Sequence, residues 1–232
     1  MTLRAVSFDA TGTLLHTARP VGELYATIAA HHGVAMAPLA IEQRFRRAFG
    51  NAPPLAFPAA ASHEIRAREK AWWRALVTHV FVDVPFRRFD AYFEDLFDFF
   101  ASPAAWRLDS DAMGVLHAVR ARGLTTLVVS NFDARLRGLL HALRLAPLLD
   151  AVTISSEAGA AKPDPRIFTR ALAPFGLSPA EVAHVGDSVR EDLAGGRAAG
   201  LRVILVGTAK LLAEVPDATV VTRLGEVPQL LV

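Results

Sequence analysis

The chain of 232 residues contains no cysteine and only three lysines, Lys70, Lys162 and Lys210. Without cysteine the protein forms no disulfide, holds no zinc through thiolates and has no thiol nucleophile. These three classes of site are therefore excluded, although the absence of cysteine does not identify a cellular compartment.

Long hydrophobic runs are also missing, although 52% of the residues are hydrophobic. Apolar segments such as LTTLVVS and LRVILVG end after a few residues, whereas a bilayer span needs ~20 apolar residues. The first residues, MTLRAVSFDA, lead directly into a strand pattern and lack the basic and apolar regions of a secretory signal. The sequence therefore predicts a soluble cytoplasmic protein that does not bind membranes.

Basic residues exceed acidic ones only slightly, and the formal net charge is +2. Arginines are spread along the chain, and a cluster such as Arg44, Arg46 and Arg47 is typical of a solvated helix face. No basic run is interleaved with aromatic residues, so a nucleic acid is not the expected partner. The sequence gives no indication of the oligomeric state.

Short apolar strand patterns alternate with helical patterns over most of the chain. The expected strands are residues 3–8, 124–129, 151–154, 182–185 and 202–206, and the expected helices are residues 110–122, 134–143, 165–175 and 189–199. This alternation predicts an α/β fold with a parallel sheet covered by helices on both faces. The strands are apolar throughout, which is typical of a sheet buried on both sides.

The alternation stops between residues 20 and 101, where only helical patterns occur, interrupted by the proline-rich NAPPLAFP. An all-helical block inserted after the first strand of an α/β sheet indicates a cap. We therefore expect a core formed by residues 1–16 and 102–232, with an α-helical cap formed by residues 17–101.

Polar residues follow four of the expected strands, at the edge of a parallel sheet where ligands usually bind. Asp9 opens the ATGT turn, Ser130 and Asn131 begin SNFD, and Lys162 lies in EAGAAKPDP. The fourth strand ends in GDSVRED, which contains two aspartates. Each motif alone is more typical of a helix cap or turn, but together they supply the parts of one reaction.

That reaction is phosphoryl transfer to a carboxylate, which forms an aspartyl-phosphate. Two carboxylates such as Asp9 and Asp187 repel each other unless a hard cation, typically Mg²⁺, lies between them. The cation also offsets the charge of a phosphate dianion that approaches an anionic nucleophile. Ser130, backbone N–H groups and Lys162 could hold the phosphoryl oxygens, and Gly12 lets the backbone turn tightly next to the ligand.

The ordered motifs FDATGT, VVSNFD, AKPDP and GDSVREDL resemble those of the haloacid dehalogenase-like superfamily over essentially the whole chain. The flanking segments HTARPVGELYATIAAHHG, SNFDARLRGLLHALRL and KPDPRIF look most like its domain-containing protein 3 subgroup. The resemblance implies a Rossmann-like core with an α-helical cap inserted after the first motif. It also implies a hydrolase that uses Mg²⁺ and acts on a phosphoric monoester.

The resemblance assigns roles to individual residues. Asp9 would be the nucleophile and a metal ligand, and Thr11 would offer its backbone carbonyl to the metal. Asp187 would bind the metal, with Asp192 as a further ligand or a supporting partner. Lys162 would stabilise the nucleophile and the transferring group.

The phosphate site is implied in the same way. Ser130 and the backbone amide of Asn131 would bind the phosphate, together with Lys162 and the turn at Gly12. The expected partner is a small phosphorylated metabolite.

Thr11 departs from the family pattern, in which most phosphatases have an aspartate two residues after the nucleophile. That aspartate protonates the leaving oxygen and later activates water, which a threonine hydroxyl cannot do because it does not titrate near neutral pH. We therefore expect slow hydrolysis of the aspartyl-phosphate and a preference for acidic leaving groups. Replacement proton donors could be His16, Glu23, His63 or Glu64, although each is more typical of a hinge or surface residue.

Two other functions stay open. Metal-independent 2-haloacid dehalogenases also lack the second aspartate, but they use no cation and would not need Asp187 and Asp192 as a pair. Alternatively, the fold could bind a phosphate ligand or a partner without turnover, with Thr11 as the mark of lost activity. The presence of Asp9 and Lys162 weighs against complete loss.

Aromatic residues are concentrated in the expected cap, where most should form its core and one or two could line a substrate pocket. They are Trp72, Trp73, Phe81, Phe86, Phe89, Tyr92, Phe93, Phe97, Phe99 and Phe100. Lys70 is the cap's single lysine, and its charged surroundings, EIRAREK, favour a solvated side chain over a catalytic one.

Overall fold

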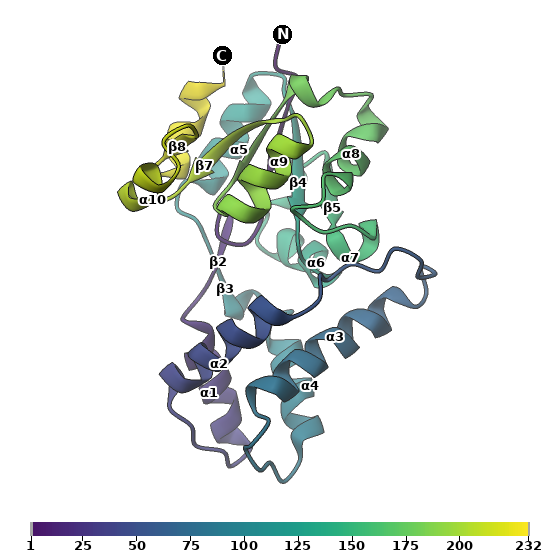
Figure 1. Cartoon of the computed structure of the whole chain (residues 1–232), viewed down its shortest axis with the longest axis vertical. Coiled ribbons are helices and arrows are strands. Elements are labelled where there is room, and N and C mark those ends of the chain that lie inside the picture. Colours follow the sequence, from purple (N-terminus) through teal and green to yellow (C-terminus); the bar gives the residue numbers. More distant parts are fainter. Residues whose placement is uncertain (1, 232) are drawn as a thin grey trace.

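The computed structural model describes residues 2–231 and contains a six-stranded sheet in the order β5-β4-β1-β6-β7-β8. Every pairing in this sheet is parallel. The predicted α/β fold is therefore confirmed (Figure 1). The strands are β1 (Ala5–Phe8), β4 (Thr125–Ser130), β5 (Ala151–Ile154), β6 (Val182–Gly186), β7 (Arg202–Val206) and β8 (Thr219–Val221).

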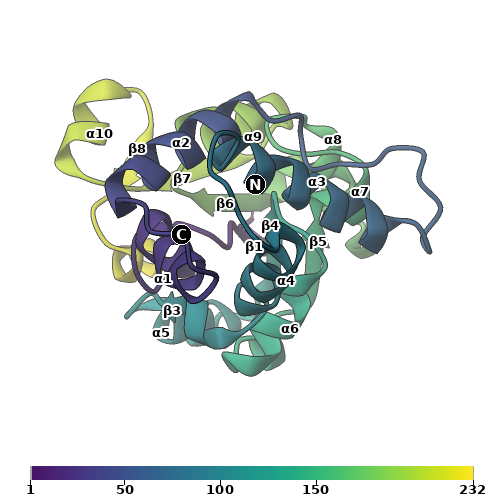
Figure 2. The same cartoon turned by 90° about the horizontal axis from the view of Figure 1, so that it is seen from below.

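Helices cover both faces of this sheet, as Figure 2 shows from below. They are α5 (Ala112–Ala121), α6 (Arg135–Ala142), α7 (Ser155–Ala158), α8 (Arg166–Leu172), a π-helix (Val189–Ala194), α9 (Gly195–Ala198) and α10 (Ala209–Glu214). Short 3₁₀ helices lie at Pro103–Ala105, Ala146–Leu148, Ala173–Phe175, Pro179–Glu181 and Leu224–Leu230.

Alternate residues of each central strand enter different apolar cores. Val6 and Phe8 of β1 pack with α5 and α6 on one face, whereas Ala5 belongs to the core that includes α8 on the other. Because side chains of a strand alternate in direction, a sheet buried on both faces needs apolar residues at nearly every position. This requirement explains the continuous apolar strand patterns of the sequence.

The prediction missed the outermost strand and a small two-stranded sheet. β8 has three residues and only one strand partner among the described residues, β7. The small antiparallel sheet pairs β2 (Leu15–Thr17) with β3 (Trp106–Leu108). Segments of three residues are too short to show a period, so only the pairing defines them.

The segment between β2 and β3 contains four helices, α1 (Val21–His31), α2 (Pro38–Asn51), α3 (Ile65–Val80) and α4 (Phe89–Phe99). They form a separate layer below the sheet in Figure 1. Their own apolar core includes Ile41, Leu76 and Tyr92. The two chain crossings between the layers are paired as β2 and β3, so the ribbon holds both connections together. We refer to these four helices as the helical layer.

No helix within residues 2–231 combines the length and the apolar character that a membrane span needs.

Candidate active site

Strand β1 lies between β4 and β6, so the chain leaves it on either side to build the two halves of the sheet. Loops diverge at such a point, and the resulting crevice is where open α/β sheets bind ligands. Asp9 directly follows β1, Ser130 ends β4, and Asp187 directly follows β6. The three predicted motifs are therefore brought to one edge of the sheet.

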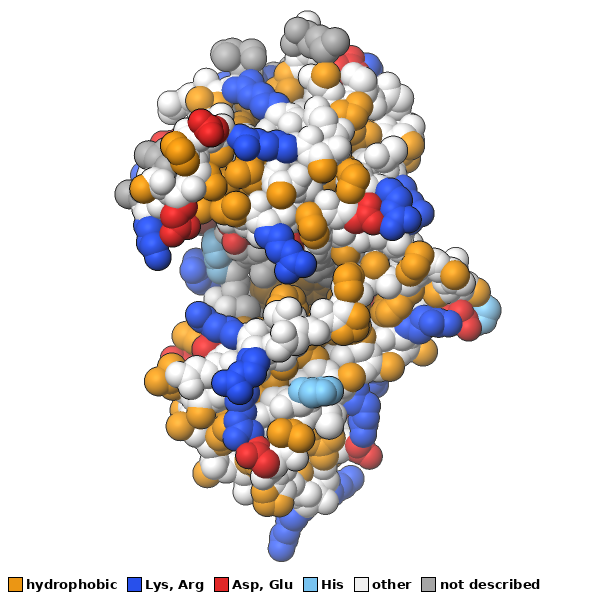
Figure 3. Space-filling view, in the orientation of Figure 1, with side chains coloured by type: hydrophobic (Ala, Val, Ile, Leu, Met, Phe, Trp, Pro, Cys, Tyr) orange, Lys and Arg blue, Asp and Glu red, His pale blue; other side chains and the backbone are white. Residues whose placement is uncertain are grey.

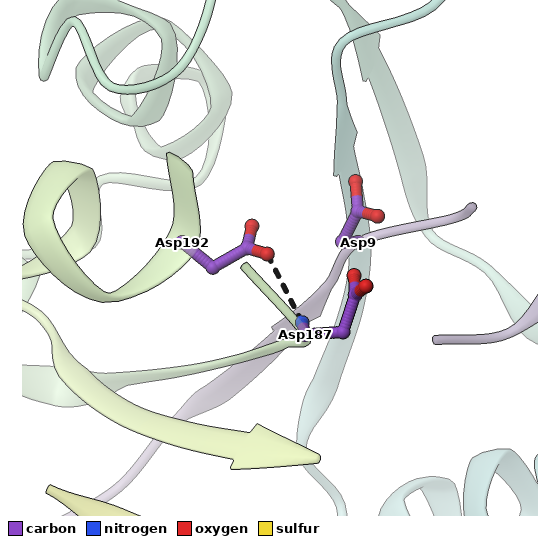
Figure 4. A group of neighbouring side chains, drawn as sticks. All are labelled: Asp9, Asp187 and Asp192. Carbon is purple, nitrogen blue, oxygen red and sulfur yellow. Dashed lines mark hydrogen bonds between the residues drawn. The ribbon is translucent and has the colours of Figure 1, made fainter. Parts of the chain in front are cut away.

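Asp9, Asp187 and Asp192 form a cluster in which one carboxylate oxygen from each lies within 4.8 Å of the others. Figure 4 shows Asp9 and Asp187 side by side, with Asp192 approaching from the helix. Withdrawal from water and the charges of the other two carboxylates raise the pKa of Asp187 to about 7. Burial also raises the pKa of Asp9, against the opposing effect of Lys162.

Lys162 joins the cluster from the loop after α7. Its Nζ donates to Asp9 Oδ1 and to Asp192 Oδ1, both at 2.6 Å. The side chain is buried, which would lower its pKa, but the two carboxylates outweigh burial and raise the pKa above its ordinary value. Lys162 therefore carries a positive charge next to the proposed nucleophile.

The side chain of Asn131 positions Lys162 through the main chain. Its Oδ1 accepts from the Lys162 N–H at 2.7 Å, and its Nδ2 donates to the Lys162 carbonyl at 2.9 Å. With both side-chain groups engaged, the part of Asn131 that is left for a ligand is its backbone amide.

Asp192 is held by hydrogen bonds at both of its carboxylate oxygens. Oδ1 lies 2.9 Å from His184 Nε2, in addition to Lys162. Oδ2 accepts from the backbone N–H groups of Asp187 and Ser188, at 3.1 and 2.9 Å. Burial opposes ionisation, but Lys162 and His184 lower the pKa of Asp192 below its ordinary value. Asp192 is thus an ionised anchor for the loop that presents Asp187.

Sequence reasoning missed His184 and Ser7, which continue this network inside the sheet. Ser7 Oγ lies 2.9 Å from His184 Nδ1, and the two residues are register partners on β1 and β6. Since ionised Asp192 only accepts, we assign Nε2–H as donor to it and Ser7 O–H as donor to Nδ1. The sequence signal that could have revealed them is that Ser7 and His184 are polar residues inside otherwise apolar strands.

Two glycines provide room for the carboxylates. Gly12 has φ +99°, in the left-handed region, and a Cβ there would collide with the Asp187 carboxylate. A Cβ at Gly186 would collide with the Asp192 carboxylate. The FDATGT turn and the GDS turn therefore approach each other more closely than any side chain would allow.

A cavity of about 1120 Å³ separates the carboxylate cluster from the helical layer. Figure 3 shows the hollow between the upper and lower parts of the molecule. Asp9, Thr11, Ser130, Asn131 and Lys162 line it from the core side. The predicted nucleophile and lysine therefore share one cavity with two of the predicted phosphate-binding residues, Ser130 and Asn131, whereas Gly12 is not part of its lining.

Comparison with known proteins identifies the family. The family model for haloacid dehalogenase-like hydrolases matches residues 3–200. The chain belongs to the haloacid dehalogenase-like hydrolase family. The resemblance seen in the four motifs is thereby confirmed.

Relatives of this hydrolase include haloacid dehalogenase-like hydrolase domain-containing protein 3 of Homo sapiens, which is 39% identical over 208 residues, 88% of this chain and 82% of the relative. A phosphoserine phosphatase of Thermus thermophilus is 38% identical over 129 residues, 55% of this chain and 51% of the relative. Among solved structures, L-2-haloacid dehalogenase from Xanthobacter autotrophicus matches with a TM-score of 0.72 and 21% identity, covering 99% of this chain and 98% of that one. This last likeness shows the fold alone.

The donor set of this hydrolase fits a hard divalent cation such as Mg²⁺. Asp9 Oδ2 and both carboxylate oxygens of Asp187 make no hydrogen bond to another side chain within residues 2–231, and they face each other. Oxygen-only donors suit Mg²⁺. The raised pKa of Asp187 reflects burial and repulsion from the neighbouring carboxylates, and a bound cation would offset that repulsion. Asp192 already satisfies both its oxygens with hydrogen bonds, so Asp9 and Asp187 are better placed as direct ligands.

None of the four suggested proton donors lines the cavity: His16, Glu23, His63 and Glu64 all lie outside it. His16 lies in β2, and its Nε2 is 3.3 Å from Oδ2 of Asp109, the residue that follows β3. The cavity lining therefore contains no replacement for the missing aspartate among these four residues.

Lys70 also lies outside the cavity lining, where it forms an ion pair with Glu94. This contact agrees with the surface role that its charged surroundings favour.

The helical layer of this hydrolase is attached to the core through a buried carboxylate that sequence reasoning did not identify. Glu69 on α3 accepts from Ser156 Oγ at 2.5 Å and from the Ala134 N–H at 3.0 Å. Burial raises the pKa of Glu69, against the two hydrogen bonds. Nearby, Trp73 Nε1 donates to Asp133 Oδ2 at 2.6 Å.

We expect the Glu69→Ala variant to lose about 2–4 kcal/mol of unfolding free energy, because Ser156 and Ala134 would each keep a buried donor without an acceptor. Urea unfolding measures this loss. Glu69→Gln, which keeps an acceptor oxygen, is the matched control and should lose clearly less. Equal stability of Glu69→Ala and the parent protein would show that these contacts do not hold the two layers together.

Proposed function

We propose that this hydrolase is a Mg²⁺-dependent phosphatase that cleaves a small phosphorylated metabolite through an aspartyl-phosphate on Asp9. The observation that supports this most directly is the meeting of Asp9, Asp187 and Lys162 beside one cavity. The relative named as a phosphoserine phosphatase supports the same reaction type. Residues 17–101, which contain the helical layer, are proposed as the cap that selects the substrate, and the cytoplasmic location stays a prediction.

The Asp9 carboxylate is the proposed nucleophile: one of its oxygens would attack phosphorus, while the other would stay with the cation, and Lys162 supports the carboxylate through Oδ1. As the new O–P bond forms, the bond from phosphorus to the leaving oxygen breaks, and that oxygen departs with the electron pair. Water then attacks the aspartyl-phosphate, releasing inorganic phosphate and regenerating the Asp9 carboxylate.

The remaining residues hold the phosphoryl group. Ser130 is largely buried and lines the cavity, and its hydroxyl makes no hydrogen bond within the described chain, so it is available to a phosphoryl oxygen. The Asn131 amide and the charge of Lys162 would complete the phosphate site. A Mg²⁺ ion held by Asp9, Asp187 and the Thr11 carbonyl would offset negative charge on the phosphoryl group.

Thr11 limits the reaction to leaving groups that depart without a proton. Its side chain lines the cavity but carries no titratable group. We therefore propose that turnover is slow. Aryl phosphates and acyl phosphates, whose leaving groups are more acidic, should react faster than alkyl phosphates.

Removal of Mg²⁺ with EDTA should lower p-nitrophenyl phosphate hydrolysis by ~10³-fold, since charge neutralisation by a bound metal contributes several kcal/mol. Added Mg²⁺ should restore the activity and raise the melting temperature, because a ligand that binds only the folded state stabilises it. Asp187→Asn is expected to lose both responses. These effects are measured by phosphate release and thermal unfolding.

The two alternatives give different results in the same experiment. Chloride release from 2-chloropropionate without a metal, with no phosphate release, would identify a dehalogenase. If no phosphate ester is hydrolysed and aluminium fluoride is not trapped on Asp9, the binding module becomes the favoured function.

A further inference from the structure

The cavity is wider than a phosphate needs, and its far wall is aromatic. Ligand pockets typically enclose roughly 300–1,000 Å³, so the present volume of about 1120 Å³ leaves space for a large leaving group. Rings reach this wall from all four helices of the helical layer and its end at Phe100, from strand β3 and from the core loop after β4. They belong to Tyr25, Phe45, Phe49, Trp72, Trp73, Phe93, Phe97, Phe100, Trp106 and Phe132.

This aromatic wall exceeds the one or two cavity residues expected from sequence. Phe45 and Phe49 are stacked on α2 with ring centroids 5.6 Å apart, and Phe49 also lies edge-on to Trp72 at 6.1 Å. The rings therefore form one continuous apolar surface, which could accept a flat apolar group.

The polar groups of this wall are already engaged by the protein. Trp73 donates to Asp133, and Trp72 Nε1 donates to the Pro53 carbonyl at 2.9 Å. Arg135 forms an ion pair with Asp133 at 2.7 Å and lies 3.9 Å from the centroid of the Phe97 ring. The Arg135 charge is therefore neutralised within the protein, and the aromatic wall itself favours an uncharged leaving group, whereas Arg190 and Glu191 line another part of the cavity.

The Tyr25 hydroxyl is the exception. Tyr25 lines the cavity, and its hydroxyl makes no hydrogen bond to another residue within residues 2–231. The hydroxyl is therefore free to pair with one hydrogen-bonding atom of a molecule bound in the cavity.

We propose that the substrate is an aryl phosphate monoester whose leaving group is an uncharged phenol of one or two fused rings with one polar ring substituent. This inference depends on the proposed phosphatase function and adds the substrate class. Two independent features lead to it. The aromatic wall favours a flat ring, and Thr11 requires a leaving oxygen that departs without protonation, which a phenolate does far more readily than an alkoxide.

Four substrates separate ring recognition from leaving-group acidity. 1-Naphthyl phosphate has both properties, acetyl phosphate has only the acidic leaving group, naphthylmethyl phosphate has only the rings, and glycerol 2-phosphate has neither. Because the two rings are buried on binding, the naphthyl ester should show a KM that is lower than the acetyl phosphate value by roughly 10–100-fold. Naphthylmethyl phosphate should inhibit competitively at similar concentrations while turning over slowly.

A naphthyl ester that shows a KM equal to or higher than the acetyl phosphate value would overturn the substrate class while leaving the phosphatase function intact. If neither the phosphate esters nor the acyl phosphate, acetyl phosphate, are hydrolysed, the proposed function itself fails. The two failures are therefore distinguishable.

Variants test the wall directly. Phe49→Ala should raise the ratio of the two KM values, naphthyl ester over acetyl phosphate, by about 3–10-fold, because Phe49 is 46% exposed at the cavity edge and its loss should be tolerated. Leu39→Ala is the matched control, on the same helix but outside the cavity, and should leave the ratio unchanged. An unchanged ratio in Phe49→Ala would contradict the proposal.

Tyr25→Phe tests the polar contact with two aryl esters, one of which, 4-methylumbelliferyl phosphate, carries a carbonyl on its ring. The variant should weaken binding of this ester, measured as an increase in KM, more than it weakens binding of the naphthyl ester. An equal effect on both substrates would show that the Tyr25 hydroxyl does not contact the substrate.

Discussion

Replacement of Asp9 by asparagine is expected to abolish phosphate release, with a loss of roughly 10⁴–10⁶-fold, the range seen when a nucleophile or its partner is removed from a hydrolase. An asparagine amide is too weak a nucleophile to form the phosphoryl intermediate. Mass spectrometry of acid-quenched protein should find a phosphoryl group on Asp9 in the parent protein and none in the variant.

The control for Asp9→Asn is a measurement of unfolding, which shows whether the variant is still folded. Lys162 keeps its second carboxylate partner, Asp192, at 2.6 Å, so the variant should still unfold cooperatively. A folded Asp9→Asn protein that retains more than a small part of the activity would mean that Asp9 is not the nucleophile.

Replacement of Thr11 by aspartate is expected to raise the turnover of alkyl phosphates such as glycerol 2-phosphate by about 10²–10⁴-fold, the usual contribution of a positioned general acid–base. Aryl phosphates should gain less, because phenolates depart without a proton. Thr11 is exposed and lines the cavity, so a carboxylate there can reach the leaving oxygen. Steady-state kinetics with both ester types measure the difference.

Thr11→Asn is the matched control, since asparagine has the shape of aspartate but cannot exchange a proton near neutral pH. It should leave alkyl phosphate turnover at the parent level. An equal increase in Thr11→Asn would show that proton transfer is not what the site lacks.

Much of the fold and part of the site could be predicted because they depend on local patterns. The strands of the central sheet are apolar and the helices between them are periodic, so the parallel sheet could be derived from order alone. Asp9, Ser130 and Asp187 lie at or directly after strand ends, and the ends of parallel strands meet at one edge. The predicted positions of these residues relative to the sheet therefore required no knowledge of side-chain packing.

Other features depend on contacts between segments far apart in the chain. Glu69 appeared to be one charge among many in a helical run, yet its partners, Ser156 and Ala134, lie beyond β4. The role of Asp192 became clear only from its hydrogen bonds, because its carboxylate oxygens pair with Lys162, with His184 and with the backbone N–H of Asp187. No short-range pattern records such pairings.

Hydrophobic periodicity and chain order were sufficient for the α/β architecture and for the strand-end residues that could perform phosphoryl chemistry, because both are properties of the linear chain. The folded arrangement was needed to learn which aromatic side chains leave the core of the helical layer to line the cavity, and which polar groups remain without partners. Both depend on how the helical layer lies against the sheet, and this geometry is set by many weak contacts between distant residues.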